Sequence, residues 1–352
     1  MLAIWRAWID TAWITNWFDP DKSPVRLLLL GIMILSLIMS AALPHAFTSR
    51  GLIFAAAYAA IQVAKPVFAV SALGADPRLR RNFQRILAWC AVSALLWLAG
   101  GAAGGTAQEA LWLAAVAMDY AAPAAGFYTP GWGRSTTSDW TIAGTHLAER
   151  CQLFLLIALG ESILDTGVTF SNLSWTAAEV GALFVAFTGT VAFWWIYFFR
   201  SAEGGSQVIA SATDPGRLGR SAYTYFHLPM VAGIIVTAVA DEITVANPGG
   251  AIQAGTAAAI LGGPALFLAG HALFKWSLSG RIYPSRLVGI AALGVLTPMA
   301  LAATPLLLAF LATLVPVGVA AWDTWTVWHA GQAARDAEPQ GTAVDATLAA
   351  RR

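Results

Sequence analysis

Two apolar stretches of the sequence carry a histidine and a glutamate at the same interval. His146 precedes Glu161 by fifteen positions, and a leucine follows the histidine. His227, also followed by leucine, precedes Glu242 by fifteen positions. Histidine exchanges protons near neutral pH, and burial moves carboxylate pKa values toward the same range. Because ionisable residues are costly inside hydrocarbon-length helices and typically mark a pathway, the two pairs predict movement of protons or a small polar solute.

The repeated interval favours an internal duplication, which would give a parallel repeat of the kind that transporter folds contain. Only the histidine, its leucine and the glutamate coincide in the two stretches, so a chance recurrence stays open. A buried histidine that only holds helices together by hydrogen bonds is the second alternative.

Five further charged residues belong to the candidate set. Glu149 and Arg150 lie in the first turns of the earlier stretch, and Asp165 lies one helical turn after its glutamate. These three join the predicted proton or solute pathway. Lys65 is the one basic residue well inside an apolar stretch, and an ammonium group there needs an anion or loses its proton. Asp119, at comparable depth, is its predicted partner in an intramembrane ion pair.

The elements that would position these residues are transmembrane helices. Hydrophobic residues make up 58% of the 352-residue chain and charged residues 11%, whereas a soluble domain carries about 25% charged residues. A helix needs about 20 apolar residues to cross the hydrocarbon core. Stretches of this kind are 26–44, 51–72, 84–101, 107–126, 146–168, 177–199, 221–242, 253–274, 286–303 and 305–329. The predicted fold class is all-α, a polytopic integral membrane bundle of about ten transmembrane helices in contact with the lipid bilayer.

The positions of the basic residues predict the orientation of these helices. All Lys and Arg residues except Arg50 and Lys65 fall in the N-terminal segment, in every second connection or in the tail. Basic connections lie on the cytoplasmic side of a membrane protein. The sequence therefore predicts a multi-pass protein of a cytoplasmic membrane with a cytoplasmic C-terminus.

Both ends of the chain differ from the central domain, residues 26–329. Residues 1–25 hold tryptophans at roughly helical spacing before an Asp-Pro-Asp break, which predicts an interfacial aromatic helix or part of a longer transmembrane helix. A secretory signal is a weaker alternative. Residues 330–352 are rich in Ala, Gly, Asp and Arg without apolar periodicity, and predict a disordered cytoplasmic tail.

Other classes of function lack the residues that they need. Cys90 and Cys151 fall within or at the end of apolar stretches and are interpreted as small apolar residues. We expect no metal and no other cofactor. The formal net charge of +1 gives no reason to expect nucleic acid binding, while an oligomer stays open.

Several segments together resemble the signature of a known family. The first is His-Leu-Ala-Glu-Arg-Cys-Gln-Leu-Phe at 146–154, followed by Ile-Ala-Leu-Gly-Glu-Ser-Ile at 157–163. Thr-Asn-Trp-Phe-Asp-Pro-Asp at 15–21 and His-Leu-Pro at 227–229 agree with it. The chain is identified on these residues as resembling the bacterial low temperature requirement protein A family along almost its whole length.

The resemblance implies an integral membrane protein of bacteria with no firmly assigned molecular activity. Family members usually begin with an additional helix that carries Glu-Leu-Phe-Phe-Asp-Leu, and nothing here matches it. The resemblance thus implies that residues 1–18 are the remnant of a second helix, and that part of the polar site is missing.

Three classes of function remain. We favour a secondary transporter or proton- and solute-translocating protein, because many spans, interrupted helices and paired buried charges suit it. A membrane-embedded enzyme that acts on a lipid is the alternative, although the sequence has no His-Glu-x-x-His or Gly-x-Ser-x-Gly motif. The third is a structural or stress-adaptive membrane protein without transport.

Overall fold

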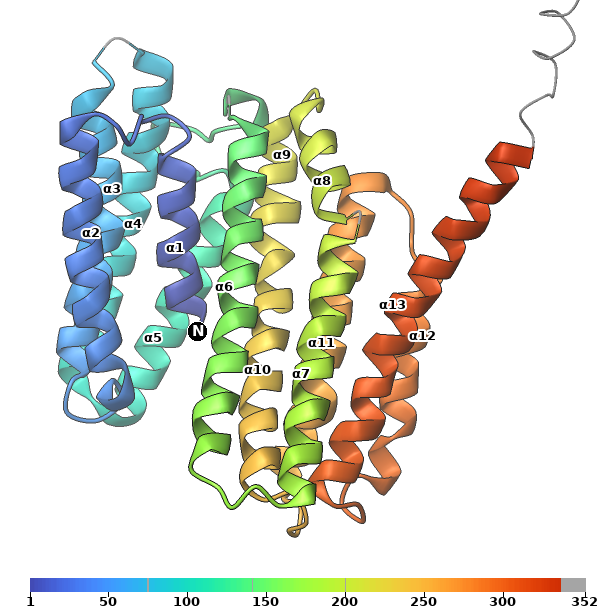
Figure 1. The fold of residues 1–352 in the computed structure, drawn as a ribbon. Coiled ribbons are helices and arrows are strands. Elements are labelled where there is room, and N and C mark those ends of the chain that lie inside the picture. The colour runs from blue at the N-terminus through green and yellow to red at the C-terminus, as the bar shows by residue number, and fades with distance from the viewer. Residues whose placement is uncertain (75, 141, 200, 337–352) are drawn as a thin grey trace, which may run out of the picture. The chain divides into compact units, whose positions relative to one another are not determined.

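Helices form nearly all of the regular structure. The computed structural model describes residues 1–336 apart from residues 75, 141 and 200. Within these residues the β-structure consists of one isolated bridge between Thr129 and Gly133. The predicted all-α class is confirmed (Figure 1).

The helices follow one another with short connections. In chain order they are α1 (Leu2–Ile14), α2 (Ser23–Ala42), α3 (Gly51–Ala72), α4 (Pro77–Ala103), α5 (Gly105–Ala124), α6 (Gly144–Ser171), α7 (Ala177–Phe198), α8 (Ser201–Ala210), α9 (Pro215–Leu218), α10 (His227–Ala246), α11 (Ala254–Ser279), α12 (Pro284–Val295) and α13 (Pro305–Asp336). Short 3-10 helices are η1 (Leu43–His45), η2 (Thr137–Asp139) and η4 (Thr297–Met299), and η3 (Gly219–Tyr225) is a π-helix.

Each predicted span coincides with a helix, but not all of these helices are suited to cross a membrane. Eight helical segments of the described chain are long and apolar enough to do so. The two exceptions are α5, which contains Gln108, Glu109 and Asp119, and the short segment Pro284–Met299. The structure thus confirms a polytopic helical membrane protein, with eight such segments where about ten spans were predicted.

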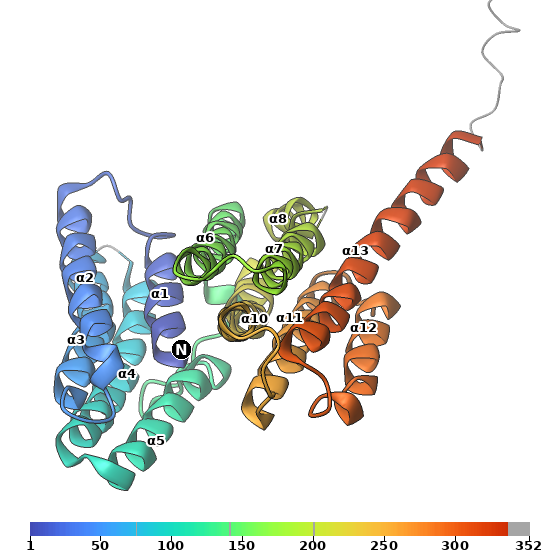
Figure 2. The ribbon, with the colours of Figure 1, turned by 60° about the horizontal axis from the view of Figure 1, so that its bottom comes forward.

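The chain divides into two compact units. Unit 1 comprises Met1–Phe154 and Glu203–Leu228, and unit 2 comprises Leu155–Ala202 and the chain from Pro229 onward. In unit 1, α2 packs on α3, α3 on α4 and α4 on α5 (Figure 2). In unit 2, α7 packs on α13, and α11, α12 and α13 pack on one another.

The first helix is packed inside unit 1. Trp5 and Ile9 of α1 are 1% and 0% exposed, and the helix contacts α3 and α5. A helix that lies in the membrane interface would keep one face open, so this burial fits a helix that belongs to the bundle. The indole of Trp5 also donates a hydrogen bond to the carbonyl of Thr224 at 3.0 Å, which ties α1 to η3.

Unit 2 brings α10 and α11 together at glycines. A Cβ on Gly233 would lie 2.5 Å from the amide nitrogen of Phe267 and 2.7 Å from the carbonyl oxygen of Gly263. Small residues permit such close backbone approach between membrane helices. At the C-terminus, α13 continues to Asp336, so the predicted disordered tail begins with helix, and residues 337–352 lie outside the described residues.

Candidate functional site

Unit 1 contains a pocket where the ends of several helices meet. Its walls come from α1, α3, α4 and the end of α5, from the connection 126–140, and from η3 with the residues before it. The pocket holds about 820 Å³, including the part that opens to the outside. Because this volume includes open solvent, the space enclosed by the protein is smaller.

Four polar side chains, Arg6, Asp10, Gln62 and Lys65, form a hydrogen-bonded row along the pocket, which we call the polar cluster. Arg6 and Asp10, one turn apart on α1, form an ion pair with 3.0 Å between nitrogen and oxygen. Gln62 of α3 donates to the Asp10 carboxylate at 3.0 Å. Lys65 donates to the side-chain oxygen of Gln62 at 2.7 Å and to the carbonyl of Ala7 at 3.1 Å. Lys65 is 3% exposed, so its ammonium group is held by two neutral acceptors in a buried position.

Asp119 lies behind the polar cluster and does not contact Lys65 directly. Its carboxylate accepts hydrogen bonds from the Tyr58 hydroxyl at 2.8 Å and from the Trp97 indole at 3.2 Å. The predicted direct ion pair between Lys65 and Asp119 is therefore not what the described contacts show. Each group is instead satisfied by neutral partners, because Gln62 and the two aromatic donors lie closer.

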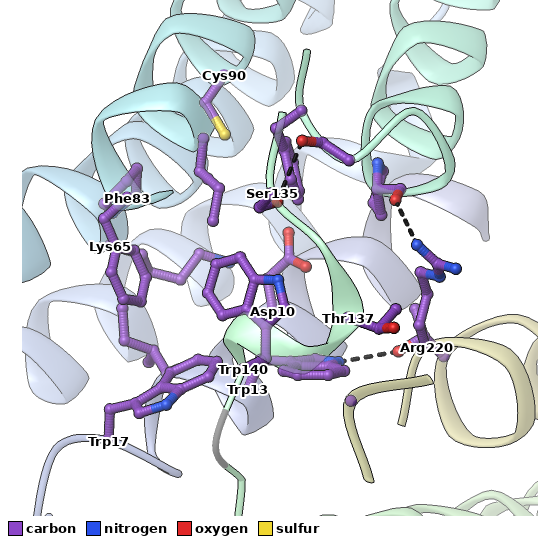
Figure 3. Close-up of a pocket in the computed structure, with 18 of the residues that line it drawn as sticks. Asp10, Trp13, Trp17, Lys65, Phe83, Cys90, Ser135, Thr137, Trp140 and Arg220 are labelled. Atoms are coloured by element: carbon purple, nitrogen blue, oxygen red, sulfur yellow. Dashed lines mark hydrogen bonds between the residues drawn. The ribbon is translucent and has the colours of Figure 1, made fainter. Parts of the chain in front are cut away.

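Aromatic rings form one side of the pocket. Trp17 is 5.8 Å from Trp13, 5.5 Å from Phe83 and 5.4 Å from Trp140, measured between ring centroids. Phe83 and Trp140 are 5.9 Å apart with their planes nearly perpendicular. We call these four residues the aromatic wall. They come from α1 and the turn that follows it, from α4 and from the connection before α6, so three separate segments must fold together to build it (Figure 3).

Arg220 stands on the other side of the pocket from Phe83 and Lys65 (Figure 3). Its guanidinium donates to the carbonyl of Pro123 at 3.1 Å, and the described chain gives it no carboxylate partner. The nearby turn needs glycine at Gly126, which has a φ of +64° and whose Cβ would strike the carbonyl oxygen of Ser135. Ser135 closes this turn by donating its backbone N–H to Gly126 at 2.8 Å.

An ion pair, a capping box and a side-chain hydrogen bond hold the C-terminal end of the connection 126–140. Thr136 and Asp139 form a capping box, and Asp139 pairs with Arg78 of α4 at 3.0 Å. Thr137 donates to the Asp214 carboxylate, at the start of α9, at 2.6 Å. The hydrogen bond from the Thr136 backbone lowers the pKa of Asp139, and the Thr136 hydroxyl and nearby arginines act in the same direction. These contacts hold the connection against the pocket.

The sequence-predicted histidines lie in unit 1. His146 shares a hydrogen bond of 3.1 Å with Thr15, so two of the family-like segments meet directly. Glu149 and Arg150 are exposed on the same helix. His227 is fully buried, with 2.9 Å between its Nδ1 and the carbonyl of Ala222 and with its ring stacked on that of Tyr223 at 5.2 Å.

The sequence-predicted acids lie in unit 2. Glu161 and Asp165 are exposed on α6, and no hydrogen bond or ion pair joins them to another described residue. Glu242 is exposed on α10 and accepts a hydrogen bond from Thr169 at 3.3 Å. This contact joins the last turns of α6 and α10, so the two helices run in the same direction there. Neither unit contains both members of a histidine–glutamate pair, and the pathway role of these residues stays a prediction.

Sequence reasoning missed three groups that the structure makes prominent. Arg6 and Asp10 lie in the aromatic N-terminal segment and were not predicted as site residues, although their spacing of one helical turn is typical of an ion pair. Asp241, the neighbour of Glu242, is only 6% exposed and has one carboxylate oxygen without a hydrogen-bond partner in the described chain. The sequence does not show which of these two neighbouring acids is buried, because α10 is apolar around most of its circumference.

Comparisons with known proteins agree with the segments discussed above. The family model described as bacterial low temperature requirement A protein (LtrA) matches residues 1–321, which include all pocket residues. The uncharacterized protein RA0937 of Rhizobium meliloti (strain 1021) is 40% identical over 299 residues, which cover 83% of this chain and 72% of the relative. No solved structure matches the chain significantly.

Proposed function

This chain belongs to the bacterial low temperature requirement A (LtrA) protein family, and from that premise we propose that it is a secondary transporter whose solute site is the pocket of unit 1. The observation that carries the proposal is the position of Lys65. Its ammonium group is buried in a helix that is long and apolar enough to span a membrane, lines a pocket and, among the described residues, donates hydrogen bonds to neutral acceptors. A charge is costly to bury without a counter-ion, and such residues in membrane proteins typically mark a solute or ion path.

Two prolines inside helices beside the polar cluster support the same reading. Pro66 of α3 and Pro123 of α5 lie inside their helices and line the pocket. A proline cannot donate to the carbonyl four residues earlier, which here belongs to Gln62 and to Asp119 respectively. Freed carbonyls at membrane depth are tolerated where they border protein or a wet cavity.

The proposal includes an orientation and a proton path. The pocket is lined by Phe83 and Ile86, which lie a few residues after the basic start of α4 at Arg78, Arg80 and Arg81, the end predicted to be cytoplasmic. We propose that His146, which contacts the segment after α1, and the buried His227 take part in proton movement, and that Glu161 and Glu242 do so as well. Loss of proton flux in Glu161→Gln or His227→Ala, with folding intact, is the expected result in vesicles that contain a pH dye.

Alternating access can be tested without knowing the solute. Ile86 of α4 lines the pocket, and Ile86→Cys in a Cys90→Ala, Cys151→Ala background places a single thiol there. The thiol is treated with the membrane-impermeant anion 2-sulfonatoethyl methanethiosulfonate in inside-out and in right-side-out vesicles. A transporter exposes the pocket to each side in turn, so we expect modification from both sides.

Two control positions calibrate the test. Arg134 is exposed in the connection that borders the pocket, and Phe47 is exposed between α2 and α3. We expect Arg134→Cys to react only from the cytoplasmic side and Phe47→Cys only from the opposite side. Reaction of the Ile86→Cys thiol from one side alone, or from neither, with both controls reactive, would contradict transport.

A further inference from the structure

We infer that the pocket of unit 1 binds a planar aromatic monoanion, meaning a flat ring system that carries one negative charge. Its role as cargo rests on the proposed function, whereas its binding does not. The inference joins two features that occur in the same pocket, an excess of cationic groups and the aromatic wall.

The charges favour an anion. Three cationic side chains, Arg6, Lys65 and Arg220, line the pocket together with one carboxylate, that of Asp10. Asp10 is paired with Arg6, so the ammonium of Lys65 and the guanidinium of Arg220 remain with neutral acceptors. Asp119 supplies a second negative charge behind the polar cluster. Counting it, three positive charges face two negative ones, and one further negative charge would balance the site.

The aromatic wall favours a flat ligand. Trp13, Trp17 and Trp140 are half-buried, so their rings are only partly covered by other protein groups. Ring systems in contact prefer offset-stacked or perpendicular arrangements with centroids 4.5–7 Å apart, and the wall already shows this spacing. A flat ring system bound against the wall would place its charged group toward Arg220 on the facing side (Figure 3).

Cationic ligands fit the same pocket poorly. An ammonium group would lie among three cations with Asp10 already engaged by Arg6 and Gln62. A small inorganic anion would meet Arg220 but leave the aromatic wall uncovered. The preferred ligand therefore needs both the charge and the ring.

The test measures binding to purified protein in phosphatidylcholine nanodiscs by isothermal titration calorimetry. The probe is naphthalene-2-sulfonate, which is flat and carries one permanent negative charge. We expect saturable binding to the wild-type protein, weaker binding of the cation 2-naphthylmethylammonium, and weaker binding of methanesulfonate. Arg220→Gln should raise the Kd of naphthalene-2-sulfonate about tenfold, the usual effect of losing a charge-assisted contact.

Arg217→Gln is the matched control, since Arg217 is exposed three residues earlier and does not line the pocket. Equal binding of the cation, equal binding of methanesulfonate, or an equal effect of both arginine variants would overturn the inference. Displacement of the probe by phosphatidylglycerol would also overturn it, in favour of a lipid.

Binding as expected without passage of the probe into vesicles would leave the ligand class standing and remove transport. Thiol access from both sides without probe binding would support transport and overturn the assignment of the ligand class.

Discussion

Lys65 donates a hydrogen bond of 2.7 Å to the side-chain oxygen of Gln62, one turn earlier on α3. The amide nitrogen of the same glutamine donates to Asp10 of α1 at 3.0 Å. A single neutral amide therefore links a buried ammonium to a carboxylate on another helix. This link holds the cation of the pocket in place without neutralising it through direct contact.

Replacing this amide should destabilise unit 1. Gln62→Leu keeps a similar side-chain volume but removes one acceptor from Lys65 and one donor from Asp10, and both groups are left under-satisfied in the protein interior. We expect a loss of about 2–4 kcal/mol in the free energy of unfolding, measured by SDS titration in mixed micelles. Gln207→Leu, at an exposed position of α8, should change little. A similar loss in both variants would show that the bridge does not matter.

The buried ion pair of unit 2 should be far more sensitive than an exposed one. Arg286 is 2% exposed and forms two contacts of 2.6 Å with Asp323. Asp323→Asn leaves that guanidinium without a carboxylate, and we expect a loss of about 3 kcal/mol in the same titration. Asp21→Asn removes the exposed pair with Arg26 and should have no measurable effect. Equal effects of the two variants would contradict this account.

The glycine contact between α10 and α11 predicts that adding one methyl group at Gly233 destabilises the protein. Gly233→Ala would place a Cβ 2.5 Å from a backbone nitrogen of Phe267, and backbone atoms cannot move aside independently. We expect a loss of about 1–3 kcal/mol in unfolding free energy from this overpacking. Gly262→Ala is the control, because a Cβ there meets nothing within 4 Å. Unchanged stability of Gly233→Ala would indicate that the two helices do not pack so closely.

Asp139 should make the protein less stable in acid. Its pKa is lowered in the folded protein, chiefly by the Thr136 backbone hydrogen bond. A carboxylate with a lowered folded pKa contributes stability above its unfolded pKa, near 3.9, and loses that contribution as the pH falls through the folded pKa. The stability difference between wild type and Asp139→Asn should be constant above about pH 5 and shrink below about pH 4. A difference that stays the same to pH 3 would contradict the assignment.

The sequence was sufficient to place the helices and to single out Lys65. Hydrophobic stretches of membrane length coincide with helices because a helix is nearly the only way to satisfy the backbone in lipid. A lone basic residue inside such a stretch is conspicuous for the same reason. Its real partners were not visible, because Gln62 is uncharged and Ala7 contributes only a backbone carbonyl.

The pocket itself required the structure. The aromatic wall joins residues from α1 and the turn after it, from α4 and from the connection before α6, and Arg220 comes from η3. No local sequence pattern predicts that these distant segments lie together in the fold. The tryptophan spacing of residues 1–25 predicts a helix, but the burial of Trp5 depends on contacts with α3, α5 and η3 that spacing does not encode.

The central claim is that the pocket of unit 1 opens to each side of the membrane in turn. The most direct measurement is the rate at which the single thiol of the Ile86→Cys variant is modified from the cytoplasmic side and from the opposite side of sealed vesicles. Transport predicts measurable modification from both sides, slowed on both when naphthalene-2-sulfonate occupies the pocket. Modification confined to one side would contradict the claim.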